Sequence, residues 1–156
     1  MSPKPSGIAN RSNSIQPKND DVTVLHLGPL DQDYHALADV LTGTEWKLCP
    51  GTQWTLAAAK DVSEGASVPI VVCERESEAG GWKDVLDALR RFPSPPLLIV
   101  ASRTADEHLW AEALNLGAYD VLSKPYYSAE VVRVLSMAWL HWTNRGTAVA
   151  VMAHAS

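Results

Sequence analysis

Short apolar runs alternate with segments of helical periodicity from residue 22 to residue 143. The apolar or β-branched runs predict five strands, and the runs at 68–73 and 97–101 are apolar almost throughout, which is typical of strands buried on both faces. Segments with apolar residues three or four positions apart predict five helices. The expected strands are 22–27, 46–49, 68–73, 97–101 and 119–122, and the expected helices are 31–42, 52–62, 82–91, 105–116 and 128–143.

This alternation predicts an α/β domain with a doubly wound, five-stranded parallel sheet in a three-layer sandwich. Parallel neighbours need crossover connections, and the crossing helices then cover both faces of the sheet. In such sheets, ligands and reacting groups lie beyond the carboxyl ends of the strands. The candidate positions for chemistry are therefore Gly28 and Pro29, Glu74, Ser102 and Lys124.

Local signals predict where individual elements begin and end. Thr104 with Glu107 forms a capping-box pattern for the helix over 105–116, which Gly117 is expected to end. Pro50-Gly51 is expected to stop the second strand, and Ser128 is expected to cap the last helix.

The two ends of the chain differ from the middle. Residues 1–20 are rich in Ser, Pro, Asn and Lys, so we expect a flexible tail that cannot bury enough apolar surface to become ordered. The run 144–146 (Asn-Arg-Gly) is a helix-stop signal, and we expect 145–156 to form a second flexible tail. The domain is thus expected to span residues 21–144.

Composition narrows the function classes. A chain of 156 residues can bury a core without disulfides or metal, and its net charge of -5 argues against a generic electrostatic grip on nucleic acid. Cys49 and Cys73 form neither a disulfide framework nor a zinc-binding spacing. No apolar run reaches the roughly 18 residues of a membrane span and no signal-peptide pattern is present, so we expect a cytoplasmic protein without membrane contact.

Three segments, VPIVVCERE, PPLLIVASRTADE and ALNLGAYDVLSKPYY, resemble the receiver domain of bacterial two-component response regulators. The resemblance covers about residues 22–143, and Gly-Ala-x-x-x-Leu-x-Lys-Pro is its most specific part. It implies a flavodoxin-like receiver fold with Glu74 at the phosphoacceptor position. It also implies that Ser102 and Lys124 contact the phosphoryl group, and that a cis peptide bond precedes Pro125.

The sequence departs from that family at the positions that bind Mg²⁺ and phosphate. The acidic pair that holds the metal aligns with Gly28 and Pro29, which carry no carboxylate. Asp31 and Asp33 follow as weaker metal-ligand candidates, although first-turn helix residues are the more typical interpretation. Glu74 is one methylene longer than the usual aspartate. Mg²⁺ is therefore the one candidate cofactor, and a doubtful one, and ordinary Mg²⁺-dependent phosphorylation is not expected. Two mechanisms stay open, a phosphate-independent receiver with Glu74 as a fixed charge and a weakly phosphorylatable one.

Two further positions bear on the alignment. Placing Cys73 at the acceptor position gives poorer spacing to Ser102 and Lys124, and Val121 stands where the family often has a switch aromatic.

Several residues have two interpretations. Glu74 is either a built-in acidic mimic of phosphate paired with Lys124, or half of an ion pair left in a decayed site. Ser102 either contacts a phosphoryl group or caps local backbone. His26 is expected to be a core histidine instead of a phosphorelay donor. Glu76 and Arg103 are expected to form an exposed ion pair across the site.

Six tryptophans are unusual for a chain with one phenylalanine. Trp82, at the start of a helix beside the site, is either a lid or a packing residue. Trp110, Trp139 and Trp142 add apolar area beyond the expected core stripes of the last two helices. They form either an interaction face or the half-buried edge of the core.

The resemblance implies signal transduction by a stand-alone, non-enzymatic receiver-like domain of a phosphorelay. Its expected partners are a sensor histidine kinase or another signalling protein, or a second copy through the last two helices. The alternatives are a small doubly wound enzyme or nucleotide- or flavin-binding protein, and an inert structural or dimerisation module. Against the first alternative, the chain has no GxGxxG or GxxxxGK[ST] loop and no evident nucleophile–His–acid set.

Overall fold

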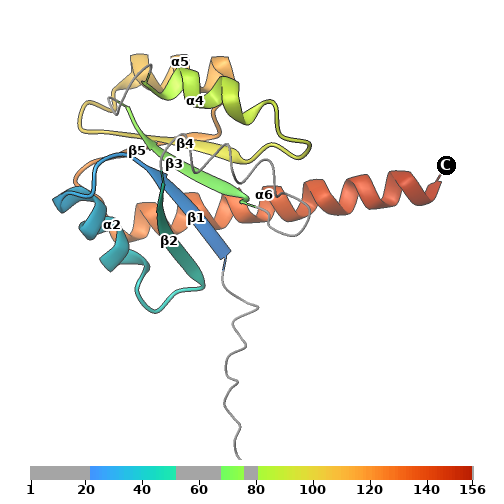
Figure 1. The fold of residues 1–156 in the computed structure, drawn as a ribbon, viewed down its shortest axis with the longest axis horizontal. Coiled ribbons are helices and arrows are strands. Elements are labelled where there is room, and N and C mark those ends of the chain that lie inside the picture. The colour runs from blue at the N-terminus through green and yellow to red at the C-terminus, as the bar shows by residue number, and fades with distance from the viewer. Residues whose placement is uncertain (1–21, 52–67, 76–80, 156) are drawn as a thin grey trace, which may run out of the picture.

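The computed structural model describes residues 22–51, 68–75 and 81–155. Five strands form one parallel sheet in the order β2-β1-β3-β4-β5, the flavodoxin-like order of doubly wound folds (Figure 1). The predicted parallel sheet is therefore confirmed. The tail expected at 1–20 and the helix expected at 52–62 lie outside the described residues. The strands are β1 (Val22–Leu27), β2 (Trp46–Gly51), β3 (Ile70–Glu74), β4 (Leu97–Ser102) and β5 (Asp120–Ser123).

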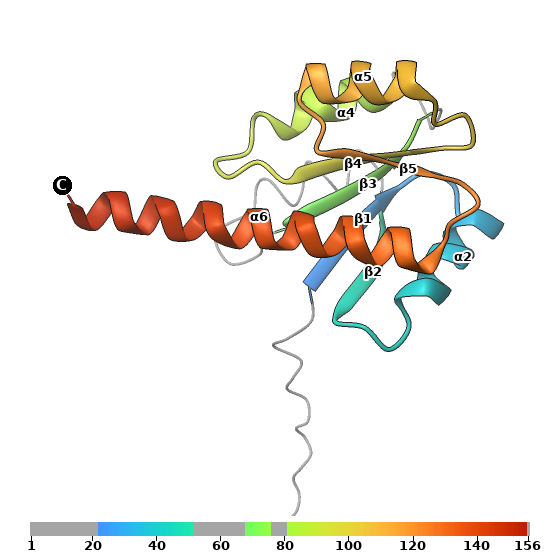
Figure 2. The same ribbon diagram turned by 180° about the vertical axis from the view of Figure 1, so that it is seen from behind.

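Helices cover both faces of the sheet. The described helices are α2 (Gln32–Leu41), α4 (Gly81–Leu89), α5 (Glu107–Leu116) and α6 (Ser128–Ala155). Helices α4 and α5 lie on one face, and α2 and α6 lie on the other (Figures 1 and 2). The chain thus has the three layers that its alternating pattern predicts. No described helix is long and apolar enough to cross a membrane.

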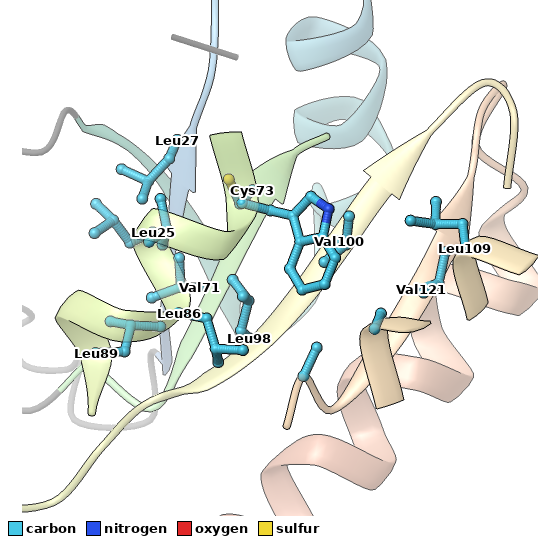
Figure 3. Close-up of a cluster of buried hydrophobic side chains, with 14 residues drawn as sticks. Leu25, Leu27, Val71, Cys73, Leu86, Leu89, Leu98, Val100, Leu109 and Val121 are labelled. Carbon is cyan, nitrogen blue, oxygen red and sulfur yellow. The ribbon is translucent and has the colours of Figure 1, made fainter. Parts of the chain in front are cut away.

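The strands divide their side chains between two hydrophobic clusters. Leu25 and Val71 face α4 and α5, where Figure 3 shows them among Leu86, Leu98 and Val100. Their neighbours along the strands point to the opposite face, toward α2 and α6. Each buried Val or Leu contributes about 1.5–3 kcal/mol relative to an exposed position, so both faces help to hold the strand ends in register.

The second strand does not stop at Pro50-Gly51. Strand β2 continues through both residues, and Pro50 lies opposite His26 of β1. This prediction was wrong because β2 is an edge strand. A proline that lacks an N–H group is tolerated there, where one side of the strand has no ladder to maintain.

Helix α5 is capped by a different residue from the one predicted. Asp106 is the N-cap, and its carboxylate accepts a hydrogen bond from the Leu109 N–H at 2.9 Å. The Thr104 hydroxyl instead lies 3.2 Å from the Ser102 hydroxyl. Gly117 ends the helix in the left-handed conformation, as predicted.

The last helix does not stop at residues 144–146. Ser128, the predicted cap, is the first residue of helix α6, which runs for 28 residues to Ala155, so the interpretation of 145–156 as a tail outside the helix is corrected. A glycine inside a helix costs only about 1 kcal/mol relative to alanine. Arg145 is also held by the fold, because its guanidinium donates to the Pro95 carbonyl at 2.7 Å and lies 4.5 Å from the Trp142 ring.

Candidate functional site

The carboxyl ends of β3, β4 and β5 bring Glu74, Ser102 and Lys124 together, as the sequence predicts. Glu74 and Ser102 are the last residues of their strands, and the Lys124 N–H donates to the Ser102 carbonyl at 3.0 Å. The peptide bond between Lys124 and Pro125 is cis, as the resemblance implies. All three side chains border one cavity of about 240 Å³, which is lined by Pro29, Asp31, Glu74, Arg75, Ala101, Ser102, Arg103, Thr104 and Lys124.

The Glu74 carboxylate has a partner on each oxygen. Oε1 forms an ion pair with Lys124 Nζ, and Oε2 lies 3.1 Å from Nε2 of His26, which is fully buried. Burial of Glu74 by itself raises its pKa, but the hydrogen bonds from His26 and Lys124 outweigh burial and hold that pKa below its ordinary value. Glu74 is therefore an ionised, nearly buried carboxylate whose charge is compensated from within the protein.

Lys124 binds a second carboxylate. Its Nζ lies 3.1 Å from Oδ2 of Asp33, in the first turn of α2. Burial alone lowers the pKa of Lys124, but the bonds to Glu74 and Asp33 raise it above its ordinary value. Arg103 also pairs with Asp33, at 2.7 Å. Glu76, its expected partner, lies outside the described residues.

Asp31 caps the N-terminus of α2. Its Oδ1 accepts hydrogen bonds from the N–H groups of Asp33 at 3.0 Å and Tyr34 at 3.1 Å, which makes it the N-cap. These bonds, the one from Tyr34 above all, lower the pKa of Asp31 although slight burial opposes them. The helix-start interpretation of Asp31 and Asp33 is thus confirmed, and Asp33 in addition reaches Lys124.

Ser102 makes local contacts, as one of its two interpretations predicts. Its buried hydroxyl accepts a hydrogen bond from the Thr104 N–H at 3.0 Å. The Thr104 hydroxyl in turn accepts from the Arg75 guanidinium at 2.9 Å. The hydroxyl at the end of β4 is thus part of a turn that shapes the cavity wall.

Gly28 and Glu74 depend on each other. A Cβ atom added at Gly28 would lie 2.3 Å from Glu74 Cγ and 3.1 Å from His26 Cε1. A side chain of any type at position 28 is therefore incompatible with the observed placement of Glu74. Glu74 occupies the space that a side chain at position 28 would need, so the glycine at position 28 and the glutamate at position 74 occur together.

The residues at this site do not fit a divalent cation. Mg²⁺ takes oxygen ligands, preferably carboxylates, in octahedral geometry. Gly28 and Pro29 offer no carboxylate, Asp31 caps α2, and both Asp33 and Glu74 are bound to Lys124. In the part of the chain that the structure describes, no group of three or more His, Cys, Asp or Glu side chains is arranged to hold a metal ion.

His26 and Tyr126 belong to the site, although sequence reasoning placed neither of them there. His26 is a core histidine, as predicted, but it also binds Glu74. The alternation of side chains along the strands could have indicated this contact. His26 lies beside Val72 of β3, and Glu74, two residues further along β3, points to the same side of the sheet. The Tyr126 hydroxyl is buried, and its pKa is raised by burial and then by the nearby charges of Glu74 and Asp33.

Other singled-out residues lie apart from this cluster. Cys73 and Val121 are buried in the cluster beneath α4 and α5, and Trp82 packs there with 4% of its surface exposed, in line with the packing interpretation. Of the three candidate interface tryptophans, Trp110 is 51% exposed. Trp139 and Trp142 are half-buried, and Trp139 packs against the core.

Solved structures of other proteins share the fold of this chain, although comparisons of the sequence alone find no match. No family model and no curated protein matches the sequence. Among solved structures, a signal receiver domain of an HD domain-containing protein from Pseudomonas fluorescens Pf-5 is similar over 80% of this chain and 98% of its own, with 21% identity and a TM-score of 0.63.

Two further solved structures are of the same kind. A response regulator in red light signaling of R. palustris matches 79% of this chain and 94% of its own, with 22% identity and a TM-score of 0.59. A response regulator receiver domain protein from Methanospirillum hungatei JF-1 matches 80% of this chain and 98% of its own, with 14% identity and a TM-score of 0.62. The chain therefore has the fold of a response-regulator receiver domain.

Proposed function

We propose that this chain is an atypical receiver-like domain of a phosphorelay that transmits signals without being phosphorylated. The observation that carries the proposal is the ion pair between Glu74 and Lys124. In a receiver domain, a lysine at this position would bind an incoming phosphoryl group, and here it already binds the carboxylate that stands in the acceptor position. Glu74 thus supplies a permanent negative charge where other receivers acquire one.

The contacts around the pair support a fixed state. Lys124 also binds Asp33, and Glu74 also binds His26. The Ser102 hydroxyl accepts a hydrogen bond from the Thr104 N–H. Phosphorylation switches a domain by adding charge that rearranges nearby hydrogen bonds. The groups that would rearrange, Lys124 and Ser102, already have partners within the protein. We therefore infer that the domain keeps one conformation.

A domain of this kind would act by contact and not by catalysis. Its expected partner is a sensor histidine kinase or another signalling protein in the cytoplasm. Trp110 is the most exposed tryptophan of the described residues and projects from α5. Buried aromatic anchors carry a large share of binding energy in protein interfaces, which makes Trp110 our candidate anchor for the partner.

The test is exposure of the full chain to Mg²⁺ and a small phosphodonor, followed by intact-mass measurement. We expect no phosphoryl adduct on the parent chain. A Glu74→Asp variant is the matched comparison, since it shortens the acid and weakens its hold on Lys124. Modification of that variant alone would support the fixed-charge role, whereas a phosphoryl group on Glu74 of the parent would refute it.

A further inference from the structure

The cavity beside Glu74 is also bordered by residues that take no part in the ion pair. Its volume of about 240 Å³ corresponds to about eight water molecules at roughly 30 Å³ each. Arg75 borders the cavity directly after the end of β3, and Thr104 borders it in the turn after β4. The family resemblance gives no role to either position. The cavity therefore has a second wall whose chemistry the ion pair does not explain.

The Arg75 guanidinium on this wall is held by contacts within the fold. Its Nη1 donates to the Thr104 hydroxyl at 2.9 Å. That hydroxyl lies 3.2 Å from the buried Ser102 hydroxyl, which accepts from the Thr104 N–H at 3.0 Å. Arg75 is half-buried, and its backbone N–H donates to the Ala101 carbonyl at 2.9 Å. These contacts fix one nitrogen of a planar fork that carries five N–H donors.

The carboxylates closest to Arg75 outside the cavity are bound to other groups. Asp106 caps α5 through the Leu109 N–H, and Glu112 pairs with Lys83 at 2.8 Å. Arg75 lowers the pKa of both carboxyl groups, although it is a minor cause in each case. Within residues 22–51, 68–75 and 81–155, Arg75 forms no ion pair of its own.

The other charges at the cavity leave Arg75 as the unmatched cation. Two carboxylates are paired with two cations in one connected group, which consists of Glu74, Asp33, Lys124 and Arg103. The Asp31 carboxylate is bound to N–H groups at the positive end of α2. One remaining positive charge suits a ligand with one negative charge. A dianion would be repelled more strongly by the Asp31 and Glu74 carboxylates that border the cavity.

We propose that the cavity binds the carboxylate of a small organic acid, held by Arg75 and the turn at Thr104, without a metal ion. A guanidinium binds a carboxylate through two parallel N–H···O bonds, and a fork that is already fixed loses little freedom when it does so. Pro29 and Ala101 supply apolar lining for the body of the acid. Unlike a phosphoryl group, this ligand is bound without displacing Lys124 from Glu74.

This inference rests on the proposed function, in which no phosphoryl group occupies the cavity. An acid bound at Arg75 supplies an input signal to a domain that is not phosphorylated. It also contacts the turn between β4 and α5, so its binding is felt at the start of the helix that carries Trp110.

The test is an NMR titration of the full chain in the presence of EDTA. The probes are benzoate, which has one carboxylate, benzamide, which has the same shape without the charge, and sulfate, which is a dianion. Benzoate should shift the backbone amide signals of Arg75 and Thr104 in a saturable manner, benzamide should not, and sulfate should bind more weakly than benzoate. Equal shifts with benzamide, tighter binding of sulfate, or no shift with benzoate would overturn the proposal.

Variants of Arg75 locate the site. Arg75→Gln should raise the Kd for benzoate at least about tenfold, because it removes charge-assisted hydrogen bonds. Arg75→Lys keeps the charge but loses the fork, so its Kd should lie between those of the parent and Arg75→Gln. Arg133→Gln, at an exposed arginine of α6, is the matched control and should bind like the parent. The amide spectrum reports the fold of each variant, and an unchanged Kd in folded Arg75→Gln would rule out this site.

The titration and the phosphodonor experiment can fail separately. A phosphoryl group on Glu74 of the parent together with saturable benzoate binding would refute the fixed-charge role and leave the carboxylate site in place. No phosphoryl group and no benzoate binding would refute the carboxylate site alone.

Discussion

Replacing Lys124 by methionine removes the ammonium group from the centre of the site while it keeps most of the apolar stem. The side chains of Lys124, Glu74 and Asp33 are only 9%, 8% and 17% exposed. The substitution therefore leaves two largely buried carboxylates without their shared cation. We expect the free energy of unfolding to fall substantially at neutral pH.

The expected size follows from burial. Removing one partner of a buried ion pair typically costs about 3–5 kcal/mol, because the remaining charge stays desolvated. Glu74 keeps His26 as a partner and Asp33 keeps Arg103, so the lower end, about 3 kcal/mol, applies here. That loss would lower the folded-to-unfolded ratio by a factor of about 100. A domain with about 5–15 kcal/mol of stability would still fold.

The assay is urea unfolding followed by tryptophan fluorescence, on the parent, Lys124→Met, Glu74→Gln and the double variant. Removal of both charges should be less costly than the sum of the single losses, with a coupling energy of about 2 kcal/mol. The slope of free energy against urea should not change. If Lys124→Met costs less than about 1 kcal/mol and the two changes are additive, the pair behaves like a solvated surface bridge and our reasoning is wrong.

The pH dependence has a defined sign. The pKa of Glu74 is lowered in the folded state, so its contribution to stability is present above the pKa of an unfolded glutamate and is lost as pH falls through the folded value. The pKa of Lys124 is raised, so its contribution is full below its unfolded pKa and is lost as pH rises through the folded value. The contribution of the pair to stability should therefore be level near neutrality, and the cost of Lys124→Met should shrink in acid.

Three further variants test the surroundings of the pair. Gly28→Ala should cost about 1–3 kcal/mol in the parent because the new Cβ overlaps Glu74 Cγ, and clearly less in a Glu74→Ala background, where the tight contacts at 3.1 Å with His26 Cε1 and the Cβ of residue 74 remain; equal costs in both, by urea unfolding, would contradict the coupling. His26→Leu should raise the pKa of Glu74 in an NMR titration, since Oε2 loses a hydrogen bond, and an unchanged pKa would deny His26 that role. Arg103→Ala should cost at most about 1 kcal/mol because Arg103 is 62% exposed, and a loss as large as that of Lys124→Met would reverse our ranking.

The fold was predictable because its signals are strong and local. Apolar runs such as 97–101 leave little choice but a buried strand, and the alternation with helices then requires parallel pairing. The meeting of Glu74, Ser102 and Lys124 follows from that topology, since parallel strands end at the same edge of the sheet. The most specific sequence element contains Lys124-Pro125, and Lys124 is the residue that binds both carboxylates of the site.

Other features depend on information that is not local. The bond between Asp33 and Lys124 joins residues 91 positions apart, and the placement of α2 over the sheet decides it. The overlap between a Cβ at Gly28 and Glu74 is likewise visible only once β1 and β3 lie side by side. The continuation of α6 past Gly146 escaped prediction because a lone glycine is a weak stop signal when no proline follows it.

The most direct test of a fixed charge at Glu74 is its own titration. The carboxyl carbon of Glu74 can be followed by NMR as a function of pH, with Glu74→Gln used to assign the resonance. Our account predicts a pKa below the ordinary value of a glutamate, because His26 and Lys124 stabilise the ionised form. A pKa at or above the ordinary value would contradict it, since Glu74 would then be a carboxyl group that the site does not hold as an anion.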